Sequence, residues 1–247
     1  MSSNPLIIDN LVMVRGTKAV VHGIKLQVKP GVVTALLGPN GAGKTSTVLG
    51  ISGVIEPAFG KVVFDHINLK GMEPDVIRRV GIATVVEGHL VLQELTVREN
   101  LLLAASSLNS SDLAISMQRV VALFPELESR LQLLAVDLSG GQQQMVALAQ
   151  ALMVTPKFLI IDELSFGLAP AIVSRLIPVI KQIAKQGIGI LLIEQFTQLA
   201  LTLADHVYVM SRGRISYDGS PQKLLDNPEI LHKAYFPVSD REAVGLN

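Results

Sequence analysis

The strongest constraint on the fold of this chain is one eight-residue stretch, Gly38-Pro39-Asn40-Gly41-Ala42-Gly43-Lys44-Thr45. It follows an apolar run at residues 32–37, which is typical of a buried strand, and it precedes a helix that we predict to begin at about Lys44. The stretch matches the pattern G-x-x-x-x-G-K-[ST], in which glycines let backbone N–H groups converge on phosphate oxygens. The positive end of the helix adds to this attraction. The sequence therefore predicts a strand–loop–helix unit that binds phosphate, in preference to a glycine-rich turn with a chance lysine.

Two side chains of this loop have predicted roles of their own. Lys44 is expected to place its charge at the β- and γ-phosphates of a nucleotide. Thr45 is expected to offer its hydroxyl to Mg²⁺.

A second motif is a buried strand at residues 158–161 that runs into two adjacent carboxylates, Asp162 and Glu163. Consecutive side chains at a strand end point in different directions. One acid can therefore face a metal ion while the next faces an attacking water. We predict Asp162 in the Mg²⁺ shell and Glu163 as a general base. Taken alone, such a pair is often only a solvated strand end, but the upstream phosphate loop favours a nucleotide site.

The third motif comes before a predicted helix and discriminates best between functions. It reads Leu138-Ser139-Gly140-Gly141-Gln142-Gln143-Gln144. Ser139 is a good N-cap, and the two glycines leave backbone donors exposed at a helix start. A second anion site is useful if it grips the γ-phosphate of a nucleotide on another subunit. The alternative is an ordinary serine-capped helix.

The remaining pattern predicts an α/β fold with a largely parallel sheet, because strands alternate with helices. Further strands are expected at residues 6–8, 11–14, 24–28, 61–64, 81–86, 189–193, 207–210 and 214–217, and helices at 171–186 and 224–235. Residues 88–152 are rich in Leu, Ala, Ser and Gln and are expected to be mostly helical.

Composition narrows the function classes. The 247 residues include no cysteine, which excludes a disulfide scaffold, a thiolate zinc site and a cysteine nucleophile. Lys plus Arg and Asp plus Glu each number 21, so a broad nucleic-acid surface is disfavoured. The hydrophobic content is 49%, yet no apolar run has the length of a membrane-spanning helix. The beginning of the chain lacks a secretion signal, and a cytosolic location is expected.

The three motifs, in this order and spacing, resemble the ATP-binding-cassette ATPases, whose signature is the Leu-Ser-Gly-Gly-Gln string. The resemblance spans residues 6–236. It implies one cassette with a P-loop NTPase (RecA-like) core, an antiparallel β-subdomain and an inserted helical subdomain. The core with its β-subdomain would comprise residues 1–87 and 149–247, and the helical subdomain residues 88–148. The resemblance also implies a head-to-tail dimer with two ATP molecules between opposed motifs.

Shorter segments are similar to one branch of that family, the ATPase subunits of branched-chain amino acid importers, and most of all to the second of their two ATPase subunits. They are Val86-Glu87-Gly88, Glu94-Leu95-Thr96-Val97, Gly167-Leu168-Ala169-Pro170, Ile193-Glu194-Gln195 and Asn227-Pro228-Glu229, with Ala234-Tyr235 near the end. Most cassettes carry Gln at position 87 and His at position 195; the second importer subunit usually carries Glu and Gln there.

The resemblance assigns site roles residue by residue. Contacts to ATP are expected from the phosphate loop and from Ser46, Arg15, Ser139, Gly140, Gly141 and Gln142. Mg²⁺ would be held by Thr45, Glu87 and Asp162. The catalytic residues would be Glu163, Lys44 and Gln195. Three positions depart from the family pattern: Arg15 replaces an aromatic residue, Leu164 a proline and Gln150 an arginine. These departures suggest a divergent member with modest turnover.

The resemblance thus implies an ATP-hydrolysing subunit of an importer for branched-chain amino acids or similar small solutes. Its expected partners are a second ATPase subunit, identical or related, integral permease subunits and a separate solute-binding protein, at the cytoplasmic face of the inner membrane. One alternative is a weakly hydrolysing cassette that acts as a nucleotide-dependent structural partner. A nucleic-acid-binding cassette would show basic arms or fused cassettes, and a kinase would not need the signature. We expect Arg78 and Arg79 to be a solvated pair at a helix end, and His206 to be structural.

Overall fold

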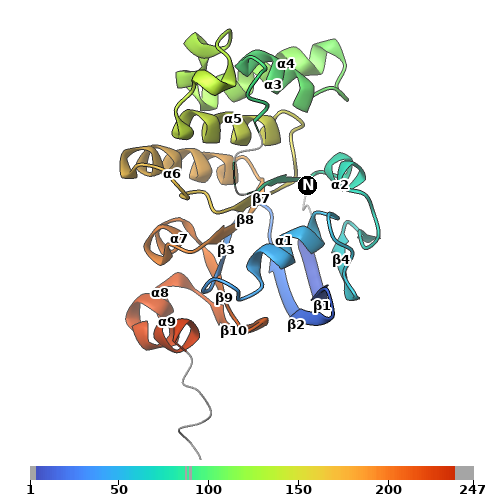
Figure 1. Ribbon diagram of the computed structural model, residues 1–247, viewed down its shortest axis with the longest axis vertical. Coiled ribbons are helices and arrows are strands. Elements are labelled where there is room, and N and C mark those ends of the chain that lie inside the picture. Colours follow the sequence, from blue (N-terminus) through green and yellow to red (C-terminus); the bar gives the residue numbers. More distant parts are fainter. Residues whose placement is uncertain (1–3, 87, 89–90, 237–247) are drawn as a thin grey trace, which may run out of the picture.

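The computed structural model describes residues 4–86, 88 and 91–236, which form two sheets and a set of helices around them (Figure 1). Within these residues the central sheet has the strand order β10-β9-β3-β8-β7-β6. All its neighbouring strands are parallel except β9 and β10, which are antiparallel. The strands are β3 (Val33–Leu37), β6 (Ile82–Val85), β7 (Phe158–Asp162), β8 (Gly189–Glu194), β9 (His206–Ser211) and β10 (Arg214–Gly219).

The second sheet is antiparallel, with the order β2-β1-β4-β5. Its strands are β1 (Leu6–Arg15), β2 (Lys18–Val28), β4 (Phe59–Phe64) and β5 (Ile67–Asn68). One face packs on helix α1 (Lys44–Ile51) through a shared apolar cluster, while the other face is more exposed. The expected strands at 6–8 and 11–14 are one continuous strand, because Asn10 takes a positive φ of 53° and the pairing register shifts there without breaking the ladder.

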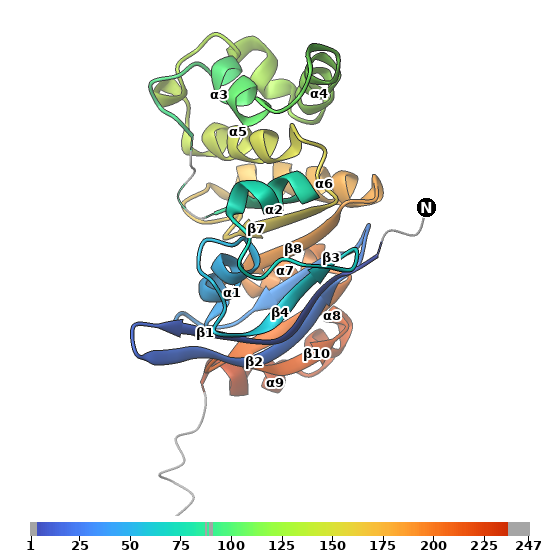
Figure 2. The same cartoon turned by 90° about the vertical axis from the view of Figure 1, so that its right-hand side faces the viewer.

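A layer of helices covers one end of the molecule, far from the antiparallel sheet (Figure 2). It contains α3 (Val97–Ala104), α4 (Ser110–Leu123) and α5 (Gly140–Leu152), with short 3₁₀ turns between α4 and α5. The expectation of a helical middle third is confirmed. We call this part the helical layer.

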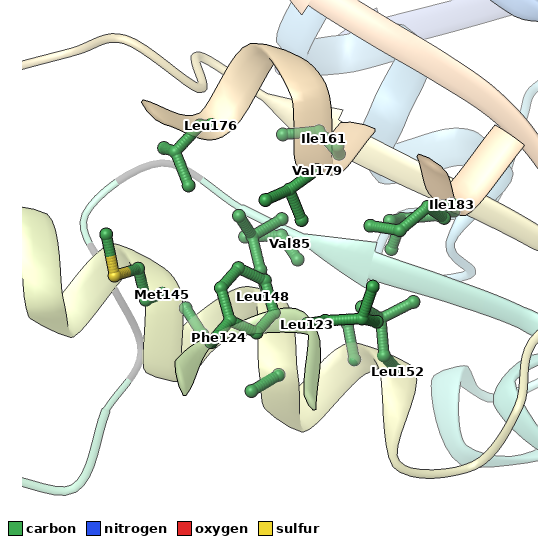
Figure 3. Close-up of a cluster of buried hydrophobic side chains, with 14 of the residues drawn as sticks. Val85, Leu123, Phe124, Met145, Leu148, Leu152, Ile161, Leu176, Val179 and Ile183 are labelled. Carbon is green, nitrogen blue, oxygen red and sulfur yellow. The ribbon is translucent and has the colours of Figure 1, made fainter. Parts of the chain in front are cut away.

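The helical layer is joined to the central sheet by a dense apolar cluster (Figure 3). Met145, Leu148 and Leu152 of α5 pack toward Leu176 and Val179 of α6 (Pro170–Lys185). These side chains are all less than 4% exposed. Truncating one buried leucine to alanine in such a core costs about 2–5 kcal/mol, so this contact holds the layer firmly against α6.

Two parts of the helix prediction need correction. The expected helix at 224–235 is two helices, α8 (Pro221–Asp226) and α9 (Pro228–Tyr235). Asn227 between them has φ −132° and ψ 72°, because a proline excludes the helical conformation from the residue before it. The short helix α7 (Thr197–Leu203) is not among the expected helices, whereas α2 (Pro74–Val80) carries the arginine pair in its last turn, as the sequence predicts for Arg78 and Arg79. None of the helices in the described residues is both long and apolar enough to cross a membrane.

The strand register decides where the motifs meet. Leu37 of β3 pairs with Glu194 of β8, and Ile193 of β8 pairs with Asp162 of β7. Because these strands are parallel, their carboxyl ends lie at one edge of the sheet. The phosphate loop, the acidic pair and Gln195 all follow directly from that edge.

Candidate functional site

The phosphate loop connects β3 to α1 and is shaped by close backbone approaches. A Cβ atom on Gly38 would lie 2.2 Å from the carbonyl oxygen of Met210 in β9. Gly43 has φ +106°, and a Cβ there would lie 2.8 Å from the carbonyl oxygen of Val20. Both positions therefore require glycine. The loop thus leads into the first turn of α1, where backbone N–H groups have no intrahelical partner.

The ammonium group of Lys44 lies over this loop. Its side chain is buried, and Nζ donates hydrogen bonds to the carbonyl oxygens of Gly38 (2.8 Å) and Pro39 (3.2 Å). Burial lowers the pKa of Lys44, and the negative charges of nearby carboxylates oppose that shift: Glu163, Asp162 and Glu194. The next residue, Thr45, is exposed at the start of the helix. The loop thus combines one cation with the open end of α1, as an anion site requires.

Asp162 and Glu163 sit in different environments. Asp162, the last residue of β7, is 2% exposed, whereas Glu163 is half-buried. The backbone of Glu163 takes a positive φ of 55°, and its N–H donates to the carbonyl oxygen of Ile193 at 2.9 Å. A non-glycine residue in this region costs about 1–3 kcal/mol and tends to occur at functional sites. The chain therefore turns sharply between the two acids.

Glu194 belongs to the same edge and was not singled out from the sequence. Its carboxylate is 1% exposed and accepts from both the N–H and the hydroxyl of Ser165, each at 3.0 Å. It also accepts from the N–H of Phe196 at 3.4 Å. Burial raises the pKa of Glu194 above its ordinary value of 4.5. Since Ser165 lies two residues after Glu163, this carboxylate anchors the loop that carries the predicted base. Its only sequence signal is an acid directly after a buried apolar run.

Two substitutions of Glu194 distinguish the stability contributed by its hydrogen bonds from the effect of its buried charge. Glu194→Ala leaves the Ser165 N–H without its acceptor and is expected to lower the free energy of unfolding by about 1–3 kcal/mol. Glu194→Gln keeps an acceptor and removes a buried charge. Because the folded pKa is raised, wild-type stability falls as pH rises from about 4.5 through the folded pKa. Denaturant unfolding of the nucleotide-free chain across pH 4–8 should show that slope in the wild type and a flatter one in Glu194→Gln. Identical slopes would refute this account.

The signature begins helix α5. Ser139 and Gln142 form a reciprocal capping box: the Gln142 N–H donates to Ser139 Oγ at 3.4 Å, and the Ser139 N–H donates to Gln142 Oε1 at 3.0 Å. Gly140 is exposed, while a Cβ on Gly141 would lie 2.7 Å from Ile172 of α6. The helical layer and α1 lie on opposite sides of α6 and the central sheet (Figure 1). One chain therefore does not bring the signature to its own phosphate loop.

The remaining expected site residues differ in exposure and in their distance along the chain from the sheet edge. Gln195 is exposed directly after β8, at the same edge as the acidic pair. Arg15 is exposed at the end of β1, where it pairs with Lys18 across the hairpin. Ser46 is buried in the first turn of α1. Glu87 lies outside the described residues.

The structure accounts for two of the departures from the family pattern and tests the expectations for the arginine pair and for His206. Leu164, where the family pattern has proline, is completely buried in the apolar cluster. The Gln150 amide donates to the Asn100 backbone oxygen at 3.3 Å and to its Oδ1 at 3.2 Å. The expectation of a solvated arginine pair is wrong for Arg78, which is half-buried because its guanidinium donates to two helix carbonyls; only Arg79 is exposed. His206 Nε2 lies within hydrogen-bond distance of Asp218 Oδ1, at 2.7 Å, and this contact links β9 to β10, which fits the structural role expected for His206.

Comparisons with known proteins agree with this geometry. The family model for ABC transporters matches residues 21–165. The branched-chain amino acid transport ATP-binding protein BraG of Pseudomonas aeruginosa is 38% identical over 210 residues, covering 85% of this chain and 90% of BraG. BraF of the same organism is 29% identical over 252 residues, covering 95% and 98%. The crystal structure of an ATP-binding cassette in its ADP conformation superimposes with a TM-score of 0.83 at 27% identity, covering 92% and 96%. The expected P-loop NTPase fold and the resemblance to importer ATPase subunits are confirmed. The chain is therefore an ATPase of the ATP-binding-cassette transporter family.

Proposed function

We propose that this chain hydrolyses ATP to drive a membrane importer for branched-chain amino acids or similar small solutes. The observation that carries the proposal is the single sheet edge where the phosphate loop, Asp162 and Glu163 meet. The solute class is supported by the similarity to BraG and BraF, which are branched-chain amino acid transport ATP-binding proteins. Leu164 and Gln150 depart from the family pattern, but each has a structural role in this fold: Leu164 is buried in the apolar cluster and Gln150 bonds Asn100. These two departures therefore do not favour a non-hydrolysing role.

The roles at this edge follow from chemistry and placement. Lys44 and the N–H groups from Gly41 to Ser46 would hold the phosphates of ATP. Thr45 and Asp162 offer the hard oxygen donors that suit Mg²⁺, and Glu87 would join them. When bound, Mg²⁺ neutralises the developing charge of the phosphates. Glu163 orients the attacking water and accepts its proton.

The site is completed by a second ATPase subunit. Ser139, Gly140, Gly141 and Gln142 of that subunit, identical or related, would donate to the γ-phosphate, since a chain cannot reach its own loop with them. Gln195 would donate its amide to the same phosphate. Phe166 and Phe196, which are 53% and 62% exposed beside the site, would be covered in the pair. Arg15 would stack its guanidinium plane on the adenine.

The membrane partner has a candidate dock between core and helical layer. A cavity of about 340 Å³ is lined by Thr84, Val85 and Val86 on one side and by Leu92, Leu103 and Ala147 on the other. Leu92 and Leu103 are about half exposed at its rim. We propose that a helix of an integral permease subunit docks here, which would place the chain at the cytoplasmic face of the inner membrane.

The domain division remains part of this proposal. We assign residues 1–87 and 149–247 to the nucleotide-binding core and residues 88–148 to the helical subdomain. The boundary after residue 148 falls within α5, so the signature helix itself joins the two parts.

Affinity purification from native membranes tests the proposal. We expect permease subunits, a second ATPase subunit and a separate solute-binding protein to co-purify, with no nucleic acid. ATP hydrolysis by the reconstituted complex should rise several-fold with a branched-chain L-amino acid and its binding protein, and not with the D-enantiomer as control. Purification with ribosomes or RNA, or a rate insensitive to every small solute, would overturn it.

A further inference from the structure

Arg78 joins the core to the helical layer. It lies in the last turn of α2, and its Nη2 donates to the carbonyl oxygen of Ala104 at 2.9 Å and to that of Gln150 at 3.0 Å. Ala104 ends α3, and Gln150 lies in the last turn of α5. One guanidinium from the core therefore caps two helices of the layer at the same time.

These two carbonyls are suited to a cation. The last four carbonyls of a helix have no intrahelical partner, and the helix dipole makes that end negative. Neither α3 nor α5 has a basic residue in its own last turn. Arg119 caps the Leu152 carbonyl at 2.6 Å, but it comes from α4, inside the helical layer. Burial lowers the pKa of Arg78, yet a guanidinium stays protonated.

The contact continues into a buried hydrogen-bond network. The Gln150 amide donates to Asn100, which is completely buried. Asn100 accepts from the Leu92 N–H at 2.9 Å and donates to the Leu92 carbonyl oxygen at 2.9 Å and to the Thr96 carbonyl oxygen at 3.0 Å. This network therefore fixes Leu92 and Thr96 at the entrance to the helical layer. Leu92, Gln150 and Arg78 also line the cavity proposed as the permease dock.

Helix α5 connects this anchor to the signature. Its 13 residues at 1.5 Å each give a rod of about 20 Å, with Gln150 near one end and Ser139 at the other. A small rotation of the anchored end moves the signature by several ångströms. The position of the helical layer relative to the core thus decides where Ser139 and Gly140 stand when two chains face each other.

We propose that Arg78 is a positioning residue for ATP-driven pairing of the ATPase subunits. By capping α3 and α5 together, it holds the signature at the angle that meets the nucleotide of the partner. The proposal rests on the proposed function, because it presumes that the signature completes the site of a second subunit.

The test uses the full chain with Glu163→Gln, in which ATP is expected to stay bound because hydrolysis is slowed. Each variant is paired with itself or with the ATPase subunit that co-purifies. Arg78→Met keeps the stem and removes the donors; Arg79→Met is the matched control, since Arg79 is exposed and bonds only Asp75 among the contacts of the described residues. We expect Arg78→Met to weaken ATP-dependent pairing in analytical ultracentrifugation by about tenfold, while the affinity of the monomer for a fluorescent ATP analogue changes less than about twofold. Arg78→Lys should recover part of the loss.

The readouts separate positioning from folding. Circular dichroism checks that each variant is folded. If Arg78→Met is not, Arg78→Lys, which keeps the charge but lacks the guanidinium fork that reaches both carbonyls, should weaken pairing in the same direction, and pairing equal to that of the parent would overturn the inference. Equal pairing by folded Arg78→Met and Arg79→Met overturns the inference and leaves the proposed function standing. Equal loss of monomer nucleotide affinity and pairing overturns it too. If the parent chain does not pair in ATP at all, the proposed function fails as well.

Discussion

Glu163→Gln is expected to reduce the steady-state ATPase rate by about 10²- to 10⁴-fold, the usual contribution of a general base. Glutamine keeps the size of the side chain and one oxygen, but it cannot accept the proton of an attacking water. The strained backbone at Glu163 and the anchoring of the following loop by Glu194 are properties of the surrounding chain, so the fold should survive. Phosphate release measured at saturating ATP checks the rate.

The same variant should still bind ATP. Lys44 and the phosphate loop are untouched, so the affinity for a fluorescent ATP analogue is expected to stay within about threefold of the wild type. Glu229→Gln, an exposed carboxylate in α9, serves as the control and should behave as wild type in both assays. Undiminished hydrolysis by Glu163→Gln would show that another group activates the water.

The parts of the site that sequence predicts are those encoded locally. The phosphate loop needs glycines at positions 38 and 43 because its backbone lies against the carbonyl oxygens of Met210 and Val20. This steric requirement is visible in the sequence as a glycine-rich motif. The buried strand before Asp162 is visible as an apolar run. Parallel alternation then places both motifs at one sheet edge, since parallel strands share the direction of their carboxyl ends.

The parts that escape sequence reasoning depend on distant partners. Arg78 looks like any charged residue at a helix end, and only the fold brings it to the carbonyls of residues 104 and 150. Glu194 bonds a residue 29 positions earlier. By contrast, the break between α8 and α9 can be predicted from the sequence, because Pro228 disfavours the helical conformation at Asn227, the residue before it. The apolar spacing continues across that proline, so the spacing alone predicts one helix where the chain forms two.

Lys44→Met tests the phosphate site by removing its one buried ammonium among the described residues. A hydrogen bond to a charged group is worth about 1.5–3 kcal/mol, so the dissociation constant for ATP should rise roughly 10- to 150-fold, and hydrolysis should fall further. The control is Lys181→Met, an exposed lysine of α6, which should bind ATP as the wild type does. Equilibrium titration with a fluorescent ATP analogue measures both.

The stability of Lys44→Met distinguishes a lost binding group from a damaged fold. Burial lowers the pKa of Lys44 from 10.5 despite the three nearby carboxylates, so the charged form is disfavoured in the folded chain. Wild-type stability should therefore rise as pH increases from the folded pKa toward 10.5, and the methionine variant should lack that rise. At pH 7 the variant should unfold at the same denaturant concentration or a higher one. If it were instead destabilised, the ammonium would be serving the fold through the carbonyls of Gly38 and Pro39, and weaker ATP binding would no longer identify Lys44 as a phosphate ligand.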